Sequence, residues 1–323
     1  MSRDICTSKL AHRFAVIGGD GRMTHLCERL AEEGHAVRVL GCGHECFSSR
    51  SGSGEIRVCT TLEKAAEAAD TVVLPLPASR DGATVHCPRD PACTVSLTDV
   101  AELVCRTPHM TLFGGRLPAA LWEGVQGHPT AALRVTDYYE SEILQLRNAY
   151  ITAEAAVMTA MEHTDRILRD ASVTVLGYGR IGKYLSRLLR AMGATVTVAA
   201  RREESLFEAA ADGCTPLLIR TDEPMKGLSR LCNGQTVLFN TVPAPILDQS
   251  FLLALEPHTL LIDLASAPFG VMDEDVRVAA EQRGIRYLRL PSLPGNYAPR
   301  DAGRIIAECV LEALHQREGG KQS

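Results

Sequence analysis

Three glycines near the middle of the chain have the spacing of a nucleotide-binding turn. In the segment VTVLGYGRIG, Gly177, Gly179 and Gly182 follow an apolar, strand-like run and precede an amphipathic, helix-like one. Gly177 would permit a tight turn, Gly179 would let the backbone approach a pyrophosphate, and Gly182 would let the helix pack on the strand. Backbone N–H groups at Arg180 and Ile181 would then donate to the phosphates. The segment therefore predicts a dinucleotide site.

Two arginines occupy the end of the next predicted strand, where a carboxylate is usual in such sites. A carboxylate there would accept hydrogen bonds from the adenosine ribose and repel a 2′-phosphate, whereas guanidinium groups reverse both preferences. Arg201 and Arg202 therefore favour NADP(H) over NAD(H) as the cofactor. The alternative is that one or both arginines are simply solvated at the strand end.

Residues at the ends of two later strands should complete the nucleotide pocket, because ligands bind at the carboxyl edge of open parallel sheets. Asn240, Thr241 and Pro243 follow one of these strands, and Asp263 and Ala265 end the other. Asp263 has two interpretations that the sequence does not separate. Its carboxylate could orient the ribose or carboxamide of the coenzyme, or it could bond to backbone groups as a structural residue.

The elements that must position these residues are strands alternating with helices along the chain. Nearly continuous apolar strands in such an alternation predict parallel sheets covered on both faces. We therefore predict an α/β protein with two doubly wound parallel-sheet domains (Rossmann-like), joined by connecting helices, with a cleft between them. The expected boundaries are 1–140 for an N-terminal flavodoxin- or Rossmann-like substrate domain, 141–170 for connecting helices with a break near 148–152, 171–298 for the NADP-binding domain, and 299–323 for a C-terminal helix packing back on the N-terminal domain.

Composition narrows the class of protein. The chain has 323 residues, of which 46% are hydrophobic and 23% charged, and its net charge of −5 argues against general binding to nucleic acids or membrane surfaces. No apolar run approaches the roughly 20 residues that span a bilayer, and the first residues lack a signal-peptide pattern, so we expect a cytoplasmic protein. The eleven cysteines lack the paired spacing of zinc motifs, so we expect free thiols and no metal site.

Several segments, taken in order and spacing, resemble one family, the A subunit of dipicolinate synthase. The resemblance extends from about residue 13 to about residue 316, and its most particular segments are the IGGDGR start and the LPGNYAPRDAG stretch. The segments that carry it are FAVIGGDGR, VLPLPAS, AEAAVMTAMEHTD, VTVLGYGRIG, NTVPAPIL, LIDLASAPFG and LPGNYAPRDAGRII.

The resemblance implies an oxidoreductase of sporulation that uses a nicotinamide acceptor, in the mother-cell cytosol of a spore-forming bacterium; with the two arginines, we expect this acceptor to be NADP⁺. With the flavoprotein-like B subunit of dipicolinate synthase, such an enzyme would aromatise dihydrodipicolinate, or its hydrated tetrahydro precursor, to dipicolinate. The implied partners are therefore the B subunit and a small dicarboxylate substrate, and self-association is left open. The resemblance assigns no acid or base.

Catalytic candidates come from position in the chain alone. The two ring carboxylates of the substrate would need cationic or polar donors, for which Arg22, Ser79, Ser266 and Arg300 are the candidates. Glu154, in the connecting helices, is the candidate for proton transfer. An exposed helical carboxylate is the alternative interpretation of Glu154.

Two other functions are compatible with parts of this pattern. A D-2-hydroxy-acid dehydrogenase shares the two-domain plan but needs a histidine near the LPSLPGNYAP segment, and no histidine lies between His258 and His315. A regulatory protein that binds NADP(H) without turnover stays open, because obvious catalytic side chains are scarce. Turnover by the purified chain would separate this second alternative from an enzyme.

Overall fold

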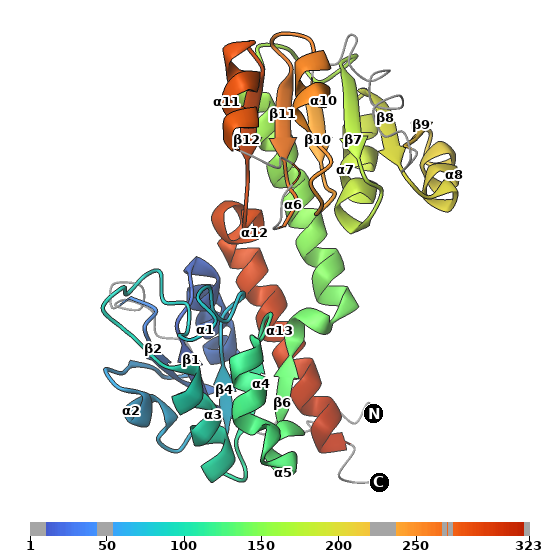
Figure 1. Ribbon diagram of the computed structural model, residues 1–323. Helices are drawn as coiled ribbons and strands as arrows, with labels where there is room; N and C mark the ends of the chain where they lie inside the picture. The colour runs from blue at the N-terminus through green and yellow to red at the C-terminus, as the bar shows by residue number, and fades with distance from the viewer. Residues whose placement is uncertain (1–10, 44–53, 220–236, 267–269, 271–273, 320–323) are drawn as a thin grey trace, which may run out of the picture. The chain divides into compact units, whose positions relative to one another are not determined.

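The computed structural model describes residues 11–43, 54–219, 237–266, 270 and 274–319 (Figure 1). The chain divides into two compact units, and each is described by itself. The first unit comprises Met1–Gln145 and Ala298–Ser323, and the second comprises Leu146–Tyr297.

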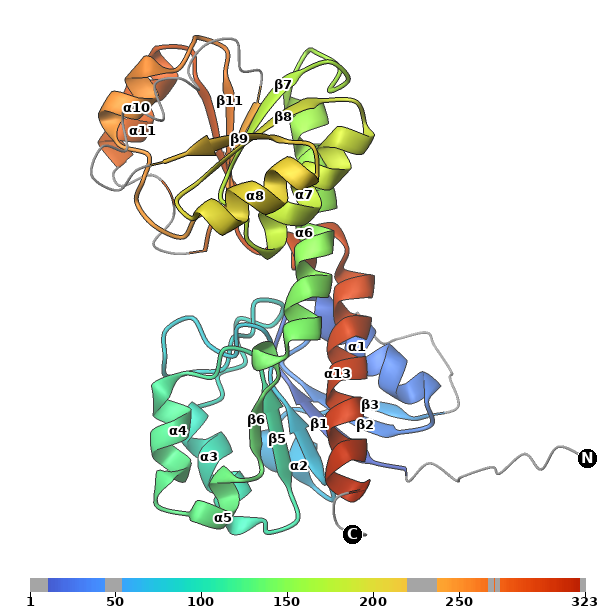
Figure 2. The same ribbon diagram turned by 90° about the vertical axis from the view of Figure 1, so that its right-hand side faces the viewer.

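The first unit is built on a six-stranded parallel sheet with the order β3-β2-β1-β4-β5-β6. Its strands are β1 (Arg13–Ile17), β2 (Ala36–Leu40), β3 (Ile56–Val58), β4 (Thr71–Val73), β5 (Thr111–Gly114) and β6 (Val135–Asp137). Its helices are α1 (Gly21–Glu32), α2 (Leu62–Ala66), α3 (Leu97–Arg106), α4 (Ala119–Gln126), α5 (Pro129–Ala132), the 3-10 helix η2 (Tyr138–Glu140) and α13 (Pro299–Gly319). Figure 2 shows α1 and α13 on one face of this sheet.

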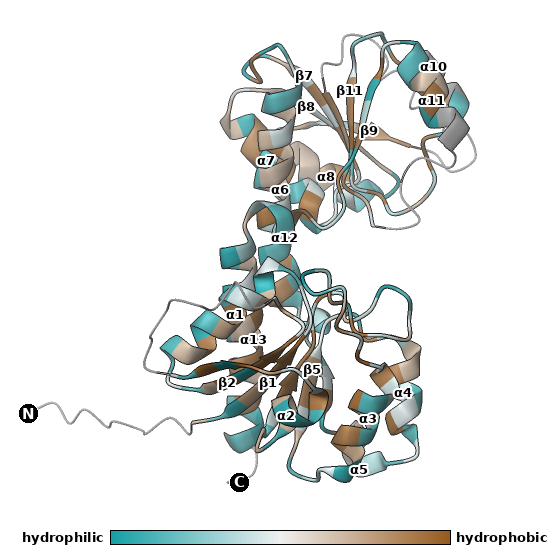
Figure 3. Ribbon diagram, turned by 90° about the vertical axis from the view of Figure 1, so that its left-hand side faces the viewer, coloured by the Kyte–Doolittle hydropathy of each residue, from teal (hydrophilic) through white to brown (hydrophobic). Residues whose placement is uncertain are grey.

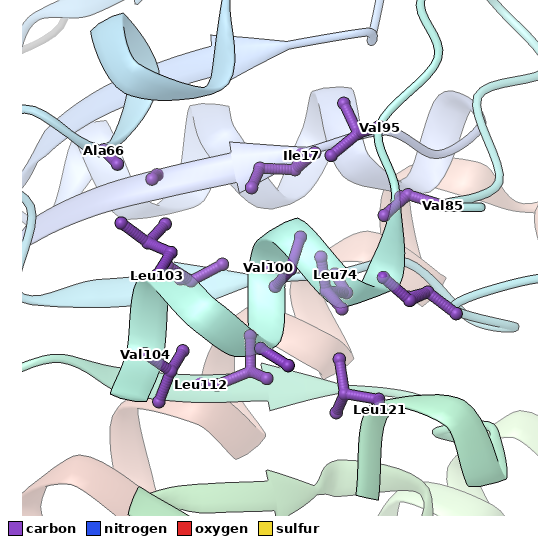
Figure 4. Close-up of a cluster of buried hydrophobic side chains, with 14 of the residues drawn as sticks. Ile17, Ala66, Leu74, Val85, Val95, Val100, Leu103, Val104, Leu112 and Leu121 are labelled. Atoms are coloured by element: carbon purple, nitrogen blue, oxygen red, sulfur yellow. The ribbon is translucent and has the colours of Figure 1, made fainter. Parts of the chain in front are cut away.

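The core of the first unit lies on both faces of the sheet, because side chains alternate along each strand. In β1, Ala15 and Ile17 belong to the cluster that α3 and α4 cover, together with Val100 and Leu121 from those helices (Figure 4). The central strands are accordingly apolar along their length, while the helices carry polar residues on their outer sides (Figure 3). This distribution is the one expected of a parallel sheet covered on both faces.

The last helix of the chain, α13, packs closely on α1. Gly303 makes this approach possible, since a Cβ atom at that position would lie 2.2 Å from the backbone oxygen of Arg22 and 3.0 Å from the Cβ of His25. The C-terminal segment is thus part of the first unit. In the same unit, the buried hydroxyl of Tyr138 donates a hydrogen bond to the backbone oxygen of Leu74, 3.0 Å away.

The second unit has a six-stranded parallel sheet with the order β12-β11-β10-β7-β8-β9. Its strands are β7 (Ser172–Leu176), β8 (Thr195–Ala200), β9 (Thr215–Leu218), β10 (Val237–Asn240), β11 (Leu260–Asp263) and β12 (Arg286–Arg289). Its helices are α6 (Glu142–His163, which begins in the first unit), α7 (Arg180–Ala191), α8 (Glu203–Ala211), α10 (Gln249–Ala254), α11 (Glu274–Gln282) and α12 (Leu293–Tyr297).

Both sheets repeat one strand order, in which the first strand of the unit lies between the second and the fourth. This is the doubly wound Rossmann arrangement, so the predicted fold class is confirmed. The point at which the order reverses lies between β1 and β4 in one sheet and between β7 and β10 in the other. Ligands of such sheets bind beyond the carboxyl ends of these strands.

One sequence expectation is wrong. Helix α6 is continuous from Glu142 to His163, without the break expected near residues 148–152. Thr152 does not interrupt it, because its hydroxyl donates a hydrogen bond to the backbone oxygen of Asn148, 2.8 Å away and one turn earlier.

Candidate functional site

The glycine turn of the second unit joins β7 to α7 at the reversal point of the sheet. Gly177 has a φ of +91°, and a Cβ there would lie 2.6 Å from the hydroxyl oxygen of Thr241. A Cβ at Gly182 would lie 2.3 Å from the backbone oxygen of Gly177. A Cβ at Gly179, by contrast, would meet no atom within 4 Å. Two glycines therefore serve the protein's own packing, and Gly179 leaves open space.

The start of α7 offers donors to an anion. Gly179 is its N-cap residue, and no side chain caps the helix there. The helix begins at Arg180, which is exposed, and continues through the half-buried Ile181. The first backbone N–H groups of a helix have no partner within it, and the helix dipole adds partial positive charge. With the open space at Gly179, this geometry suits a pyrophosphate.

Tyr178, inside the glycine motif, ties the turn to the rest of the unit. Its side chain is buried, and its hydroxyl donates a hydrogen bond to the carboxylate of Asp212, which also accepts one from Nε of Arg187 at 2.8 Å. Burial and the neighbouring Asp212 raise the pKa of Tyr178, and the hydrogen bond from Tyr178 helps to lower the pKa of Asp212. Tyr178 is not among the residues predicted from sequence. The only signal there is its position between two glycines of the motif, which does not reveal its partner.

The two arginines lie where the sequence placed them. Arg201 directly follows β8, and Arg202 is the N-cap residue of α8. Both side chains are exposed, and neither forms an ion pair with a carboxylate among the described residues. Glu203 and Glu204 follow in the first turn of α8. The guanidinium groups are therefore available to an incoming anion.

A buried polar network lies at the carboxyl ends of β10 and β11. Asp263 is 0% exposed, and its Oδ1 accepts hydrogen bonds from Nδ2 of Asn240 at 2.8 Å and from the backbone N of Ala265 at 3.1 Å. Its Oδ2 accepts from the backbone N of Gly270 at 2.9 Å and from the hydroxyl of Tyr287 at 3.1 Å. Four protein donors thus surround this carboxylate, which fits the structural interpretation of Asp263.

The turn after β10 is fixed against the glycine turn. Asn240 is buried, and its Oδ1 accepts a hydrogen bond from the backbone N of Val242 at 3.1 Å. The hydroxyl of Thr241 donates to the backbone oxygen of Leu176 at 2.8 Å. Pro243 is exposed beyond them. Asn240 and Thr241 therefore shape the edge of the candidate nucleotide pocket, while Pro243 faces outward.

The first unit has a second charged turn at its own reversal point, between β1 and α1. Arg22 is only 6% exposed, and its guanidinium donates from Nε to Oδ1 of Asp20 at 2.9 Å and from Nη2 to Oδ2 at 2.7 Å. Nη2 also donates to the backbone oxygen of Leu76. Burial opposes ionisation of Asp20, but the hydrogen bonds and charge of Arg22 hold its pKa below the ordinary value. No hydrogen-bond partner of the Arg22 Nη1 lies among the described residues.

Ser79 is engaged within its own loop. Its hydroxyl donates to Oδ1 of Asp81 at 2.9 Å and accepts from the backbone N of Gly82 at 3.0 Å. The hydroxyl and backbone N of Thr84 also donate to Asp81, and these hydrogen bonds hold the pKa of the Asp81 carboxyl far below its usual range. Ser79 therefore stabilises a turn at the carboxyl edge.

The remaining candidates are exposed side chains. Ser266 follows β11 at the carboxyl edge of the second sheet, and Arg300 is the second residue of α13 in the first unit. Glu154 lies on α6 and forms no hydrogen bond or ion pair within the part of the chain that the structure describes. The structure thus brings Arg22 and Ser79 to one sheet edge, but it gives Glu154 no partner for proton transfer among these residues.

Within the described ranges, no group of three or more His, Cys, Asp or Glu residues could hold a metal ion. The described cysteines form no disulfide bonds with one another. The tightest cluster of possible metal ligands in the sequence is Cys42, His44, Glu45 and Cys46, of which the last three lie outside the described residues. None of the described helices combines the length and apolar character needed to cross a membrane.

Comparisons with known proteins agree with this architecture. The family model for the N-terminal domain of the dipicolinate synthase A subunit matches residues 13–135. The A subunit of dipicolinate synthase from Bacillus subtilis (strain 168) is 31% identical over 312 residues, which cover 96% of this chain and 98% of the relative.

Solved structures extend the comparison to three dimensions. The crystal structure of the dipicolinate synthase A chain from Bacillus subtilis matches with a TM-score of 0.79 and 29% identity, covering 97% of this chain and 98% of that one. A transhydrogenase from Sinorhizobium meliloti shares the fold at 18% identity, with a TM-score of 0.64 over 94% of this chain and 92% of its own. The identity and the nearly complete coverage of the curated relative show that this chain belongs to the family of dipicolinate synthase A subunits.

Proposed function

We propose that this chain is an NADP-dependent oxidoreductase that aromatises dihydrodipicolinate, or its hydrated tetrahydro precursor, to dipicolinate. The observation that carries the proposal is the turn at Gly179, which combines open space and an uncapped helix start with two arginines at the neighbouring strand end that have no ion pair among the described residues. The name of the Bacillus subtilis relative suggests the product, and the glycine turn of the Rossmann-like second unit supports nicotinamide chemistry.

The residues of the second unit fit a dinucleotide. The pyrophosphate would lie against the backbone N–H groups of Arg180 and Ile181, and Gly177 keeps the turn tight enough for that approach. Arg201 and Arg202 would pair with the 2′-phosphate, for which their planar guanidinium groups are suited. When bound, NADP⁺ would supply the hydride acceptor, at C4 of its nicotinamide.

The protein's contribution at the nicotinamide end would be rigidity. Asp263 joins the turn after β10 to the segment after β11, because it accepts hydrogen bonds from Asn240, Ala265 and Gly270. A buried network in which every partner is satisfied holds its loops in one arrangement. Asp263 would therefore act on the coenzyme by positioning the pocket edge, and Asn240 and Thr241 would line that edge.

We propose Arg22 as the residue that binds a carboxylate of the substrate. Its guanidinium is buried and held in one orientation by Asp20 and the backbone of Leu76, so little side-chain entropy is lost on binding. Its Nη1 remains to donate to a carboxylate oxygen, and a hydrogen bond between charged groups contributes about 1.5–3 kcal/mol. Ser266 and Arg300, both exposed, would be further carboxylate donors.

From dihydrodipicolinate, the proposed reaction removes a hydride and a proton from the ring and yields NADPH, a proton and dipicolinate. From the hydrated tetrahydro precursor, one water molecule leaves as well. A second kind of polypeptide, expected from the letter A in the family name, would be the partner of this chain. Sporulation in the mother cell would be its setting. These assignments rest on the family rather than on any contact within the chain.

Turnover tests the proposal directly. The purified full-length chain is mixed with NADP⁺ and freshly generated dihydrodipicolinate, and NADPH and dipicolinate are measured with and without the B subunit. Equal amounts of both products from this chain alone support the enzyme. NADP⁺ binding without turnover, unless the B subunit is present, would instead favour the regulatory role, and absence of nucleotide binding would refute both.

A further inference from the structure

Two thiols meet at the carboxyl edge of the sheet in the first unit. Cys87 is buried and Cys93 is half-buried, and both lie in the segment between β4 and α3. A Cβ atom at Gly41, directly after β2, would lie 2.9 Å from Sγ of Cys93 and 3.0 Å from Sγ of Cys87. Both sulfurs therefore lie beside one point, and a hydrogen bond joins the two side chains. Neither forms a disulfide bond in this structure.

Two turns and two glycines hold the sulfurs in this position. The backbone N of Asp90 donates to the backbone oxygen of Cys87 at 3.2 Å, and the backbone N of Cys93 donates to that of Asp90 at 2.9 Å. Gly18 and Gly41 both have a φ of +72°, and a Cβ at Gly18 would lie 3.0 Å from Sγ of Cys87. A side chain at either glycine would press on a sulfur, so the two glycines leave room for the pair.

We propose that Cys87 and Cys93 form a site of reversible thiol–disulfide exchange, which takes a small-molecule disulfide as its oxidant. A disulfide bond requires Cβ atoms about 3.8 Å apart and sulfurs that can approach to about 2.05 Å. Two thiols that are already in contact at the ends of a short, hydrogen-bonded loop need little movement to reach this geometry. The proposal does not rest on the oxidation proposed above.

The exchange needs no metal and no further cofactor. The Cys93 thiolate attacks one sulfur of the small disulfide, which forms a mixed disulfide and releases one small thiolate. The Cys87 sulfur then loses its proton and attacks the Cys93 sulfur, which releases the second small thiol. Two protein thiols are oxidised to one disulfide, and one small disulfide is reduced to two thiols.

The contact between the two thiols sets the order of these steps. Burial raises the pKa of both, that of Cys87 to about 12, and the charge of Asp90 adds to the effect. The hydrogen bond from Cys87 acts in the opposite direction on Cys93, because it stabilises the Cys93 thiolate. Cys93 is also the more exposed thiol. It should therefore attack first, slowly at neutral pH and about tenfold faster one pH unit higher, since the thiolate is the reactive form.

The pair lies beside the turn that carries Arg22. The backbone N of Gly19 donates to the backbone oxygen of His86, the residue before Cys87, at 2.8 Å. Asp20, which caps α1, follows directly. A bond between Cys87 and Cys93 would therefore fix the loop that supports this turn.

Peptide mapping of the full-length Cys105→Ser variant tests the proposal. The protein is incubated with oxidised glutathione, alkylated and digested with trypsin, which cleaves after Arg80, Arg89 and Arg106. A Cys87–Cys93 bond then joins peptide 81–89 to peptide 90–106, and the serine removes the second cysteine of the latter. Mass spectrometry should find the joined peptides in more than about half of the chains, and excess reduced glutathione should separate them.

Single variants in the same background test the order of attack. Cys87→Ser should leave Cys93 as a lasting mixed disulfide with glutathione, because no second thiol resolves it. Cys93→Ser should leave Cys87 modified at least about tenfold less. Cys42→Ser is the matched control, since Cys42 is buried nearby and its Sγ donates to the backbone oxygen of Gly18 at 2.9 Å. That variant should form the joined peptides as before.

Far-ultraviolet circular dichroism and thermal unfolding confirm that every variant is folded. Three outcomes would each overturn the proposal: no joined peptides after oxidation, joined peptides that persist in excess reduced glutathione, or glutathione attached faster to Cys87 than to Cys93. The proposed oxidation of the substrate is measured without any added disulfide, so its success or failure is a separate result.

Discussion

The assignment of NADP(H) rests on Arg201, so reversing its charge is the sharpest test of the cofactor proposal. The side chain is exposed at the end of β8 and forms no ion pair among the described residues. Arg201→Asp therefore breaks no ion pair within the described part of the protein, and we expect the fold to be unaffected. In the proposed site, the new carboxylate would face the 2′-phosphate when NADP⁺ binds. When NAD⁺ binds, it would face two ribose hydroxyls instead.

The size of the effect follows from the exposure of the site. An exposed ion pair contributes about 0.2–1 kcal/mol, and a hydrogen bond between charged groups contributes about 1.5–3 kcal/mol in more protected places. Because Arg201 is exposed, we take about 1 kcal/mol for the lost contact and about as much again for the new repulsion. The sum of about 2 kcal/mol corresponds to about a 30-fold rise in the Kd of NADP⁺.

Isothermal titration calorimetry with NADP⁺ and NAD⁺ measures both constants at one ionic strength, since salt screens exposed charges. The Kd of NAD⁺ should stay within about threefold of the wild-type value, because the new carboxylate accepts hydrogen bonds from ribose. Arg283→Asp, an exposed arginine in the turn between α11 and β12, changes the net charge equally and serves as the control. Equal losses for both coenzymes, or no loss for either, would refute the phosphate assignment.

Three further predictions concern the turn, the polar network and pH. Gly179→Val should weaken NADP⁺ binding at least tenfold without lowering the Tm. Gly182→Val should lower the Tm as well, since its side chain meets the turn backbone. Calorimetry measures the binding of each variant, and thermal unfolding measures its Tm. Asp263→Ala removes the acceptor of four buried donors and should lower the free energy of unfolding, measured in urea, by on the order of 3 kcal/mol. A loss below about 1 kcal/mol would contradict a stabilising role for this network. The Asp70 carboxylate, whose Oδ1 lies 3.6 Å from Nδ1 of His12, raises the pKa of His12. The stability that His12 contributes should therefore be full below its unfolded pKa of about 6.5 and disappear as pH rises through the folded value. Unfolding of wild type and His12→Asn at pH 5.5 and 8.5 should show a larger difference at 5.5.

The parts of the fold that the sequence predicts are those that depend on patterns of neighbouring residues. Apolar strands followed by amphipathic helices repeat along both units, and this alternation is enough to predict parallel sheets. The turn at Gly177 is predictable for a related reason, because its glycines, the strand before it and the helix after it are contiguous. Arg201 and Arg202 follow from the same unit, since they lie one strand later.

Contacts between distant segments are what the sequence does not reveal. Asp263 has two interpretations from sequence, and only the approach of Tyr287, from the next strand, and Gly270 shows that its carboxylate is surrounded by donors. Tyr178 similarly gains its partner, Asp212, from the end of α8. Each pairing depends on how strands are ordered in space, which spacing along the chain does not encode.

The acid or base is the weakest part of a prediction from sequence for the same reason. Glu154 is a candidate from sequence because of its position in the connecting helices, among small apolar residues. On the helix, however, those small residues are the buried side, and Glu154 shares the opposite side with Tyr150 and Met158. A carboxylate that is conspicuous in sequence can thus belong to a surface, whereas Arg22, inconspicuous beside a glycine turn, is the buried charge that the fold holds in one orientation. Burial combined with an unused donor is the reason that we propose Arg22 as a binding residue.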